Sequence, residues 1–165
     1  MTNIFEVHES EFITLRDSDF IIENGILKKY VGMSTKIEVP EGVIVFDEYA
    51  FENSPIRELI CPSTLKRIEK NCFMNSALHK INLNYGLLVI HDYAFANCDM
   101  LTDVQFPISI KVIGARAFSN TKISRVKLPE DILYVASDAF GGTPFKDYIK
   151  QKIKRLYFEN FDDNI

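Results

Sequence analysis

The 165-residue sequence predicts a right-handed solenoid of about five stacked coils, and three periodic features carry this prediction. A phenylalanine preceded by alanine or cysteine recurs at steps of 22, 22, 23 and 22 residues. A proline, replaced once by Asn84, stands eleven residues before each phenylalanine, and seven positions per unit hold apolar residues or cysteine, with Ser34 the one exception. A unit cannot bury such a row alone, so neighbouring units must stack, with the usual right-handed crossover. The closing phenylalanines are Phe51, Phe73, Phe95, Phe118 and Phe140.

Composition and charge limit the classes of protein to which the chain can belong. It is 47% hydrophobic and 25% charged, and no apolar run approaches the ~20 residues needed to cross a bilayer. The net charge of −4 argues against nucleic acid as the partner, because phosphate binding needs a concentrated basic surface. The first residues lack the basic and apolar regions of a secretory signal. We therefore expect a single-domain cytoplasmic protein, or a secreted or cell-surface one if a signal is encoded upstream.

Residues 1–33 are predicted to form an N-terminal cap. The dipeptide Asn24-Gly25 lies between two apolar runs, which is the strongest two-residue signal for a β-hairpin. A solenoid needs its end rows covered, because exposed apolar surface and free strand edges would pair with other chains. We expect the hairpin to close the front of the array.

Residues 34–143 are predicted to form the five coils. In each unit a short segment ahead of the proline mark alternates apolar and polar residues, as a strand with one buried face does. Stacking places these segments side by side, so we expect a parallel sheet along one side of the solenoid. The segments are 37–39, 59–61, 81–83, 104–106 and 126–128.

The turn after each closing phenylalanine is also periodic. Its second position holds asparagine in four units and Gly142 in the fifth, and serine, cysteine or threonine follows. Such residues form turns and bond to nearby backbone groups, which predicts an asparagine ladder along the solenoid axis. The extra residue of the 23-residue step, Asp99 or Met100, is expected to bulge in this turn. The ladder positions are Asn53, Asn75, Asn97 and Asn120.

Residues 144–165 are predicted to form a C-terminal capping helix and a tail. Pro144 follows Thr143 as it does at a helix start, and apolar residues then recur at helical spacing, which predicts a helix over residues 144–158. Its basic residues either bind an acidic partner, RNA or an anionic membrane, or, as we favour, form a solvated face that complements the helix C-terminus. These residues are Lys146, Lys150, Lys152, Lys154 and Arg155.

The units resemble the BspA-like leucine-rich repeats. The pattern of that family is roughly a leucine, a short strand ending in proline, an Ile-Gly pair, and Ala-Phe shortly before a cysteine, and residues 101–118 follow it closely. Residues 20–30 look like the hairpin that often opens such arrays. The resemblance covers about residues 20–143 and implies a leucine-rich-repeat solenoid. Known members are often surface or secreted proteins that bind host or matrix proteins. This sequence departs from the family pattern in that the Ile-Gly pair occurs only at Ile113-Gly114.

No constellation of residues predicts catalysis, a metal or a cofactor. His8, His79 and His91 are scattered, and the chain has no Cys-x-x-Cys motif, glycine-rich phosphate loop or nucleophile elbow. Cys98 and His91 share one unit, so a cysteine nucleophile is conceivable, but Cys98 holds a slot that serine or threonine fills in other units. We expect Cys98 to be structural, like Cys61 and Cys72, and all three thiols to be reduced.

The outward side of the predicted sheet is the candidate binding surface. One row ahead of each strand alternates in charge, and a second row lies beside it. Either the rows only support stacking of the coils, or they form a recognition face, as solenoid surfaces often do. We name the ten residues the sheet face: Lys36, Glu58, Lys80, Asp103 and Arg125 in the first row, and Glu38, Ile60, Asn82, Gln105 and Lys127 in the second.

A second candidate surface is a stripe of outward dipeptides, which we name the apolar stripe. Seven of its ten residues are large and apolar, so either it forms an interface or the pairs are partly covered. Its members are Ile44-Val45, Lys66-Arg67, Leu88-Val89, Lys111-Val112 and Leu133-Tyr134.

These surfaces leave three functions open. The sequence favours a non-catalytic protein-binding or scaffolding module that uses the sheet face to bind a protein it does not identify. The alternatives are a self-assembling structural protein, weakly dimerised through the apolar stripe, and a surface adhesin. No nucleic acid or membrane partner is expected.

Overall fold

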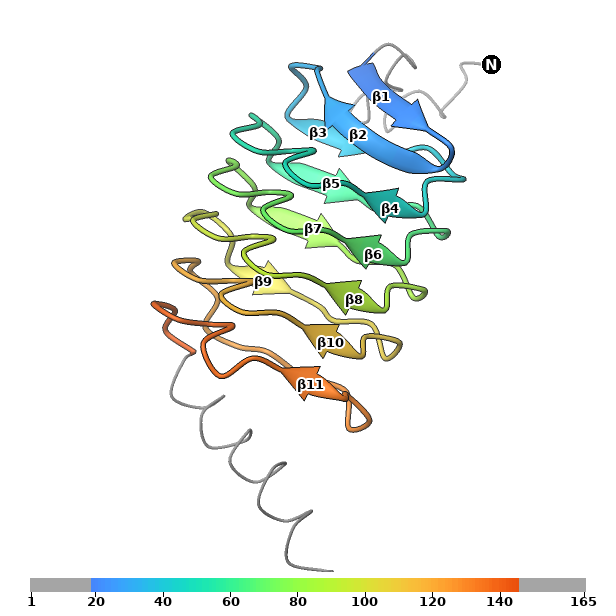
Figure 1. The fold of residues 1–165 in the computed structure, drawn as a ribbon. Coiled ribbons are helices and arrows are strands. Elements are labelled where there is room, and N and C mark those ends of the chain that lie inside the picture. The colour runs from blue at the N-terminus through green and yellow to red at the C-terminus, as the bar shows by residue number, and fades with distance from the viewer. Residues whose placement is uncertain (1–18, 146–165) are drawn as a thin grey trace, which may run out of the picture.

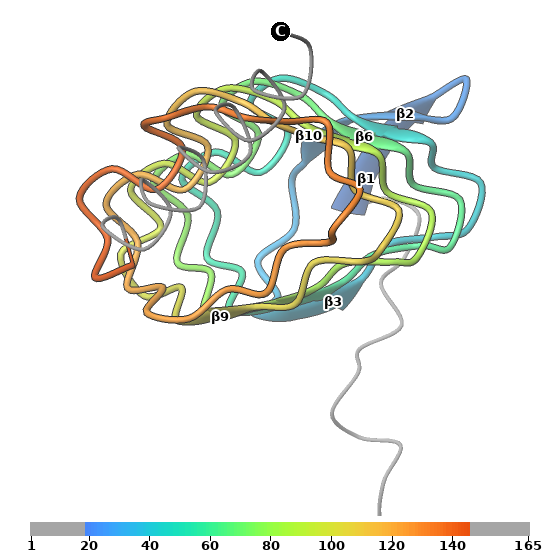
Figure 2. The same ribbon diagram turned by 90° about the horizontal axis from the view of Figure 1, so that it is seen from below.

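The computed structural model describes residues 19–145, which wind into a solenoid of stacked coils (Figure 1). Seen along its axis, the solenoid has a sheet on each of two opposite sides of the core (Figure 2). The sequence predicted the first of them, a four-stranded parallel sheet made of β3 (Lys36–Glu38), β5 (Glu58–Ile60), β7 (Lys80–Asn82) and β9 (Asp103–Val104). The prediction of a fifth strand over residues 126–128 is wrong, because this segment pairs with no strand.

The second sheet was not predicted. Its strands after the hairpin are only two residues long, too short to show an alternation in the sequence, and they pair in parallel from coil to coil. The sheet consists of β1 (Phe20–Glu23), β2 (Ile26–Tyr30), β4 (Val45–Phe46), β6 (Arg67–Ile68), β8 (Val89–Ile90), β10 (Val112–Ile113) and β11 (Tyr134–Val135).

A column of stacked aromatic rings runs through the core. The five closing phenylalanines are at most 1% exposed, and their rings lie nearly parallel, with centroids 4.7 to 5.2 Å apart. Offset aromatic pairs at such distances stabilise the fold beyond the area that they bury. The column ties each coil to the next, so no coil is independent of its neighbours.

The front of the array is closed by the predicted hairpin. Strand β1 pairs antiparallel with β2, and Asn24 and Gly25 in the turn both have the positive φ that this tight connection needs. Strand β2 then pairs in parallel with β4, and the Tyr30 ring lies 5.9 Å from that of Phe51. The hairpin therefore extends both the sheet and the aromatic column ahead of the first coil.

The predicted asparagine ladder is present in part, because hydrogen bonds join three of its four asparagines. Asn97 donates from Nδ2 to Oδ1 of Asn75 at 3.0 Å, and Asn120 donates in the same way to Asn97 at 2.9 Å. All four ladder asparagines have a φ between 55° and 60°, a left-handed conformation that asparagine tolerates better than most residues. Asp99 and Met100, one of which is the extra residue, are both exposed after the third closing phenylalanine, where the bulge was expected.

At the far end, Thr143 closes the last turn by donating from Oγ1 to the carbonyl oxygen of Phe140 at 2.7 Å. The Phe145 ring packs edge-on against Phe140, with centroids 5.6 Å apart. The predicted capping helix over 144–158 lies outside the described residues, apart from the turn at Pro144 and Phe145. Residues 19–145 contain no helix that could span a membrane.

Candidate functional site

The sheet face lies on the outer side of the four-stranded sheet, as the alternation predicted. Its first row is aligned by strand pairing in the order Lys36, Glu58, Lys80 and Asp103. All ten residues are exposed or half-buried, whereas the residues between them, such as Leu59 and Ile81, are buried. The structure therefore brings the predicted residues together on one surface, and their part in binding stays a prediction.

Few charges of the sheet face are neutralised within it. Lys36 Nζ lies 3.4 Å from Glu58 Oε1, and exposed pairs of this kind typically contribute ~0 to 1 kcal/mol. The other five charged residues of the sheet face form no ion pair within residues 19–145. These residues are Glu38, Lys80, Asp103, Arg125 and Lys127. Their charges are available to a partner.

A groove interrupts the sheet face between β9 and residues 125–129. It has a volume of about 540 Å³ and is lined on one side by Asp103 and Gln105 and on the other by Arg125 and Lys127. Its floor is apolar and includes Phe106 and other core residues of the two coils. The sequence pattern gave no sign of this groove, because every residue in it occupies its regular repeat position.

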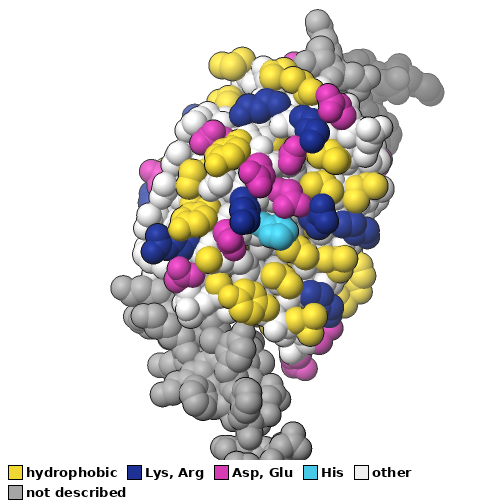
Figure 3. All heavy atoms as spheres, viewed as in Figure 1, with side chains coloured by type: hydrophobic (Ala, Val, Ile, Leu, Met, Phe, Trp, Pro, Cys, Tyr) yellow, Lys and Arg dark blue, Asp and Glu magenta, His cyan; other side chains and the backbone are white. Residues whose placement is uncertain are grey.

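The apolar stripe is only partly exposed. Leu133 is 75% exposed, Tyr134 and Ile44 are each 47% and Leu88 is 41%, and Figure 3 shows hydrophobic side chains spread over this side of the molecule. The prediction that every pair faces out is wrong at Val45, which is only 9% exposed because it lies beside the hairpin, in register with Ile26.

A lysine and two half-buried valines reduce the exposed apolar area of the stripe further. Val89 and Val112 are half-buried, and the Lys111 ammonium pairs with the Asp131 carboxylate between the third and fifth pairs of the stripe. The exposed apolar residues therefore form separate groups at the two ends and the centre of the sheet.

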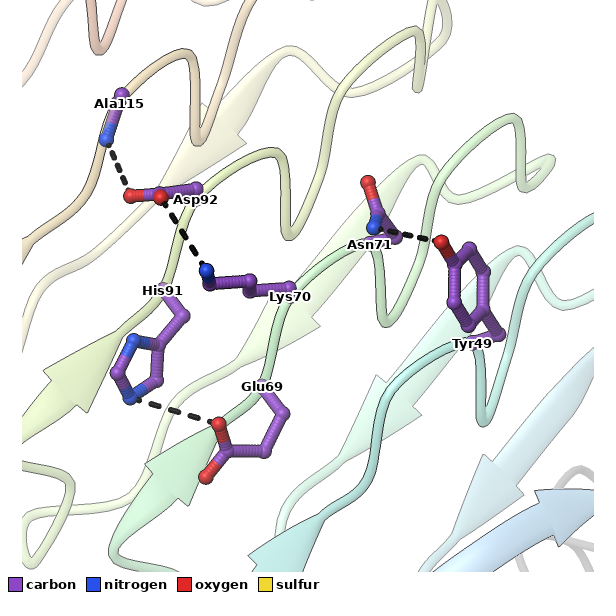
Figure 4. A network of polar contacts seen from close by, with 7 residues as sticks. All are labelled: Tyr49, Glu69, Lys70, Asn71, His91, Asp92 and Ala115. Atoms are coloured by element: carbon purple, nitrogen blue, oxygen red, sulfur yellow. Dashed lines mark hydrogen bonds and ion pairs between the residues drawn. The ribbon is translucent and has the colours of Figure 1, made fainter.

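A polar network that the sequence did not reveal lies beside the short strands (Figure 4). Glu69 contacts Arg67 at 3.1 Å and His91 Nε2 at 3.5 Å. Asp92 lies 3.9 Å from Lys70 Nζ and accepts a hydrogen bond from the backbone N–H of Ala115 at 2.8 Å. These contacts join neighbouring coils, so the network supports stacking. Residues 19–145 contain no group of His, Cys, Asp and Glu that would hold a metal ion.

Gly114 is explained by this network. A Cβ atom at Gly114 would lie 2.4 Å from Asp92 Oδ1 and 2.6 Å from the Asp92 backbone nitrogen. The Asp92 carboxylate occupies that space in order to reach the N–H of Ala115. The one surviving Ile-Gly pair therefore marks the coil that donates this hydrogen bond.

The structure does not bring Cys98 and His91 together as a catalytic pair. Cys98 is fully buried, and its sulfur lies 3.3 Å from Ser76 Oγ and donates to the carbonyl oxygen of Phe73 at 3.1 Å. Burial raises the pKa of Cys98 to about 11, so the thiol is neutral and a poor nucleophile near neutral pH. His91 instead pairs with Glu69 on the outer surface.

A second depression lies beside the asparagine ladder. It has a volume of about 490 Å³ and is lined partly by Tyr93, Arg116 and Asp138. The Arg116 guanidinium lies 5.8 Å above the centre of the Tyr93 ring and its Nε is 3.2 Å from Asp138 Oδ2. The side chains that would offer charge to a ligand here are already engaged with each other.

The repeat is matched by a family model described as "BspA type Leucine rich repeat region", with six copies over residues 21–146. Six copies agree in number with the six parallel strands β2, β4, β6, β8, β10 and β11, whereas the sequence grid counted five full units. No curated protein matches the chain.

Two solved structures are similar to the chain, and the first of them shares its fold. A leucine-rich repeat protein from Bacteroides ovatus ATCC 8483 is 22% identical with a TM-score of 0.63, over 74% of this chain and 38% of that protein. This chain thus spans less than half of the length of that protein. The T. pallidum leucine-rich repeat protein TpLRR is 20% identical with a TM-score of 0.49, over 81% of this chain and 88% of that one.

Proposed function

Because the chain belongs to the BspA-type leucine-rich repeat family, we propose that it is a non-catalytic protein-binding or scaffolding module that acts through its sheet face. The observation that carries this proposal is the set of outward side chains held in register on a buried core, with five charges that have no ion-pair partner within residues 19–145. The proposal supposes a protein partner.

The geometry of the sheet face suits a protein partner for two reasons. Its side chains project from short strands whose inner residues, such as Ile81 and Val104, are 3% exposed, so the backbone beneath them is fixed before binding. A fixed surface loses less conformational entropy on association. Charges of both signs alternate along the first row, which favours a partner with a complementary charge pattern and speeds its approach.

The absence of an activated nucleophile within the described residues supports the non-catalytic part of the proposal. Burial raises the pKa of Cys61, Cys72 and Cys98, which keeps all three thiols protonated. An active cysteine normally has a lowered pKa and an accessible sulfur.

Site-specific photocrosslinking in the native cell tests the proposal. A photoreactive amino acid replaces Asn82 in the centre of the sheet face, and a matched variant carries it at Glu48, an exposed residue beside the other sheet. We expect a discrete crosslinked protein at position 82 that is absent at position 48. Equal crosslinking at both positions would show that the sheet face is not the binding surface.

A weaker second function is self-association through the apolar stripe, favoured by the high exposure of Leu133 and Tyr134. The interruption at Lys111 and the burial of Val45 limit the area that two copies can bury, so we infer a concentration-dependent dimer at most. Sedimentation analysis of the wild type beside a Val89→Lys, Leu133→Lys double variant tests this inference. Identical monomeric behaviour of the two proteins at high concentration would exclude it.

A further inference from the structure

The groove in the sheet face has an identifiable cause, which is the size of Phe106. The position just ahead of the proline mark holds Val39, Cys61, Leu83 and Leu128 in the other coils, and each of these is at most 7% exposed. Phe106 places a larger ring in the same position, edge-on to Phe118 with centroids 5.4 Å apart and edge-on to Phe140 at 6.4 Å. The ring therefore contacts the closing phenylalanines of both the fourth and the fifth coil.

The fifth coil is displaced from the fourth on this side of the solenoid. Ring centroids in the aromatic column are 4.7, 4.8 and 4.9 Å apart along the first four coils and 5.2 Å apart between the fourth and fifth. Val126 is half-buried, although the equivalent residues of the earlier coils are at most 3% exposed. A side chain too large for its slot forces such shifts in a packed core.

The displacement leaves one edge of β9 without a strand partner within residues 19–145. Strand β9 pairs with β7 on one side, while residues 121–129 form no strand on the other. A free edge presents backbone N–H and C=O groups that can bind an extended chain. The floor of the groove offers apolar contacts at Phe106 and Val126, and Ile108 at its rim is 62% exposed.

The charges at the groove define the partner. Arg125 and Lys127 stand two residues apart, so both face outward, and neither forms an ion pair within the described residues. On the opposite wall Asp103 is the single acidic residue. Two adjacent cations above an apolar floor are complementary to a strand whose side chains alternate between acidic and apolar.

We propose that the groove between β9 and residues 125–129 binds an extended peptide segment that carries two acidic side chains two residues apart. The segment adds as a strand to the free edge of β9, its apolar side chains contact Phe106 and Val126, and its carboxylates reach Arg125 and Lys127. This inference rests on the proposed protein-binding function and assigns it a peptide class and a place on the sheet face.

The test uses the full chain and a fluorescein-labelled peptide of alternating valine and glutamate, flanked by glycine, with binding followed by anisotropy. We expect the Arg125→Glu, Lys127→Glu double variant to bind at least about tenfold more weakly. The matched control, Arg57→Glu with Lys70→Glu, changes the net charge equally at two exposed residues outside the sheet face and is expected to bind within about twofold of the wild type. A peptide with lysine in place of glutamate is expected not to bind.

Two further measurements separate strand addition from simple charge attraction. N-methylation of alternate peptide amides removes backbone donors and keeps the charges, so it should weaken binding about tenfold if the peptide pairs with β9. Phe106→Leu restores the side-chain size found in the last coil and should let the fifth coil approach β9. We expect this variant to lose the peptide and to slow hydrogen exchange at the amides of residues 125–127, with Arg125 and Lys127 unchanged.

Several results would overturn the inference. The first is equal binding by the Arg125→Glu, Lys127→Glu variant and its control, and the second is no effect of N-methylation. The third is no binding at millimolar peptide. The fourth is slow hydrogen exchange at residues 125–127 in the free wild type, which would mean that the groove is already covered. Crosslinking of a partner at position 82 without peptide binding would remove this inference alone, whereas loss of both would also remove the proposed function.

Discussion

Replacing Phe95 with alanine is the most direct test of the stacked core. The Phe95 side chain is fully buried, and its ring is stacked on Phe73 at 4.8 Å and on Phe118 at 4.9 Å. The substitution forfeits about 1.5 to 3 kcal/mol of transfer free energy. A residual cavity of about 60 Å³ adds roughly 1.5 kcal/mol, and loss of two stacked pairs brings the total to the upper half of a range of about 3 to 5 kcal/mol.

Urea unfolding followed by far-ultraviolet circular dichroism measures this loss, since the chain contains no tryptophan. Phe95→Leu keeps most of the volume and should cost about 1.5 kcal/mol or less, so it remains measurable if the alanine variant fails to fold. Tyr85→Ala serves as the control, because Tyr85 is 71% exposed and its loss should stay within about 0.5 kcal/mol. A loss below about 1 kcal/mol for Phe95→Ala would refute the idea that the aromatic column holds the coils together.

Four other predictions follow from local contacts. Gly114→Ala should destabilise the fold by about 1 to 3 kcal/mol in the same assay, because its Cβ atom meets Asp92 backbone at 2.6 Å, and an unchanged midpoint would contradict this. Asn97→Ala should lower the free energy of unfolding by about 1 kcal/mol more than Asn97→Gly does. Both variants lose the ladder bonds, but only glycine adopts the left-handed φ without strain. Equal midpoints would show that the backbone conformation carries no strain. Burial raises the pKa of Cys98 to about 11 from 9.0, so between these pH values the folded chain holds a proton that the unfolded chain releases. The stability that this thiol contributes should therefore be full below about pH 9 and fall as the pH rises toward 11. Thiol titration should find three reactive groups in denaturant without reductant and almost none in the folded protein, and fewer than three in denaturant would indicate a crosslink.

The sequence predicts the core well because each core position recurs in all five units, and the same kind of residue fills it each time. Leu101, Ile110 and Ala117 occupy grid positions and are fully buried, as the grid required. The grid fails at Phe106 and Val126, which are partly exposed although their positions are regular. A repeat pattern records the polarity of a position, whereas the displacement arises from the volume of one ring against the next coil.

The second sheet and the polar network were missed for a related reason. Two-residue strands carry no period, and the left-handed positions two residues before the first four closing phenylalanines hold dissimilar residues such as Tyr49, Asn71 and Arg116. The shared conformation of these positions is imposed by stacking, so the residue types alone do not reveal it. Only Asn71 carries the usual preference for positive φ.

The sheet face was predictable in position and unpredictable in charge balance. Alternation within a strand decides which side chains point outward, and it placed Lys80 and Lys127 correctly. Whether a charge finds a partner depends on side-chain distances of a few ångströms. Lys36 pairs with Glu58, whereas Lys127 forms no ion pair within residues 19–145. Those distances are a property of the folded chain.

The asparagine ladder has a direction, and Gly142 ends it. Asn97 and Asn120 each donate to the asparagine of the preceding turn, so Oδ1 of Asn120 is left facing Gly142. A Cβ atom at Gly142 would lie 2.3 Å from that oxygen. A duplicated unit of 22 residues inserted among the inner coils would find an asparagine amide on each side to donate to it and to accept from it. A unit appended after the fifth turn would find none, because that turn has glycine in place of asparagine. A unit added after the fifth turn would therefore lack the side-chain hydrogen bond that joins the inner turns, because Gly142 has no side-chain amide.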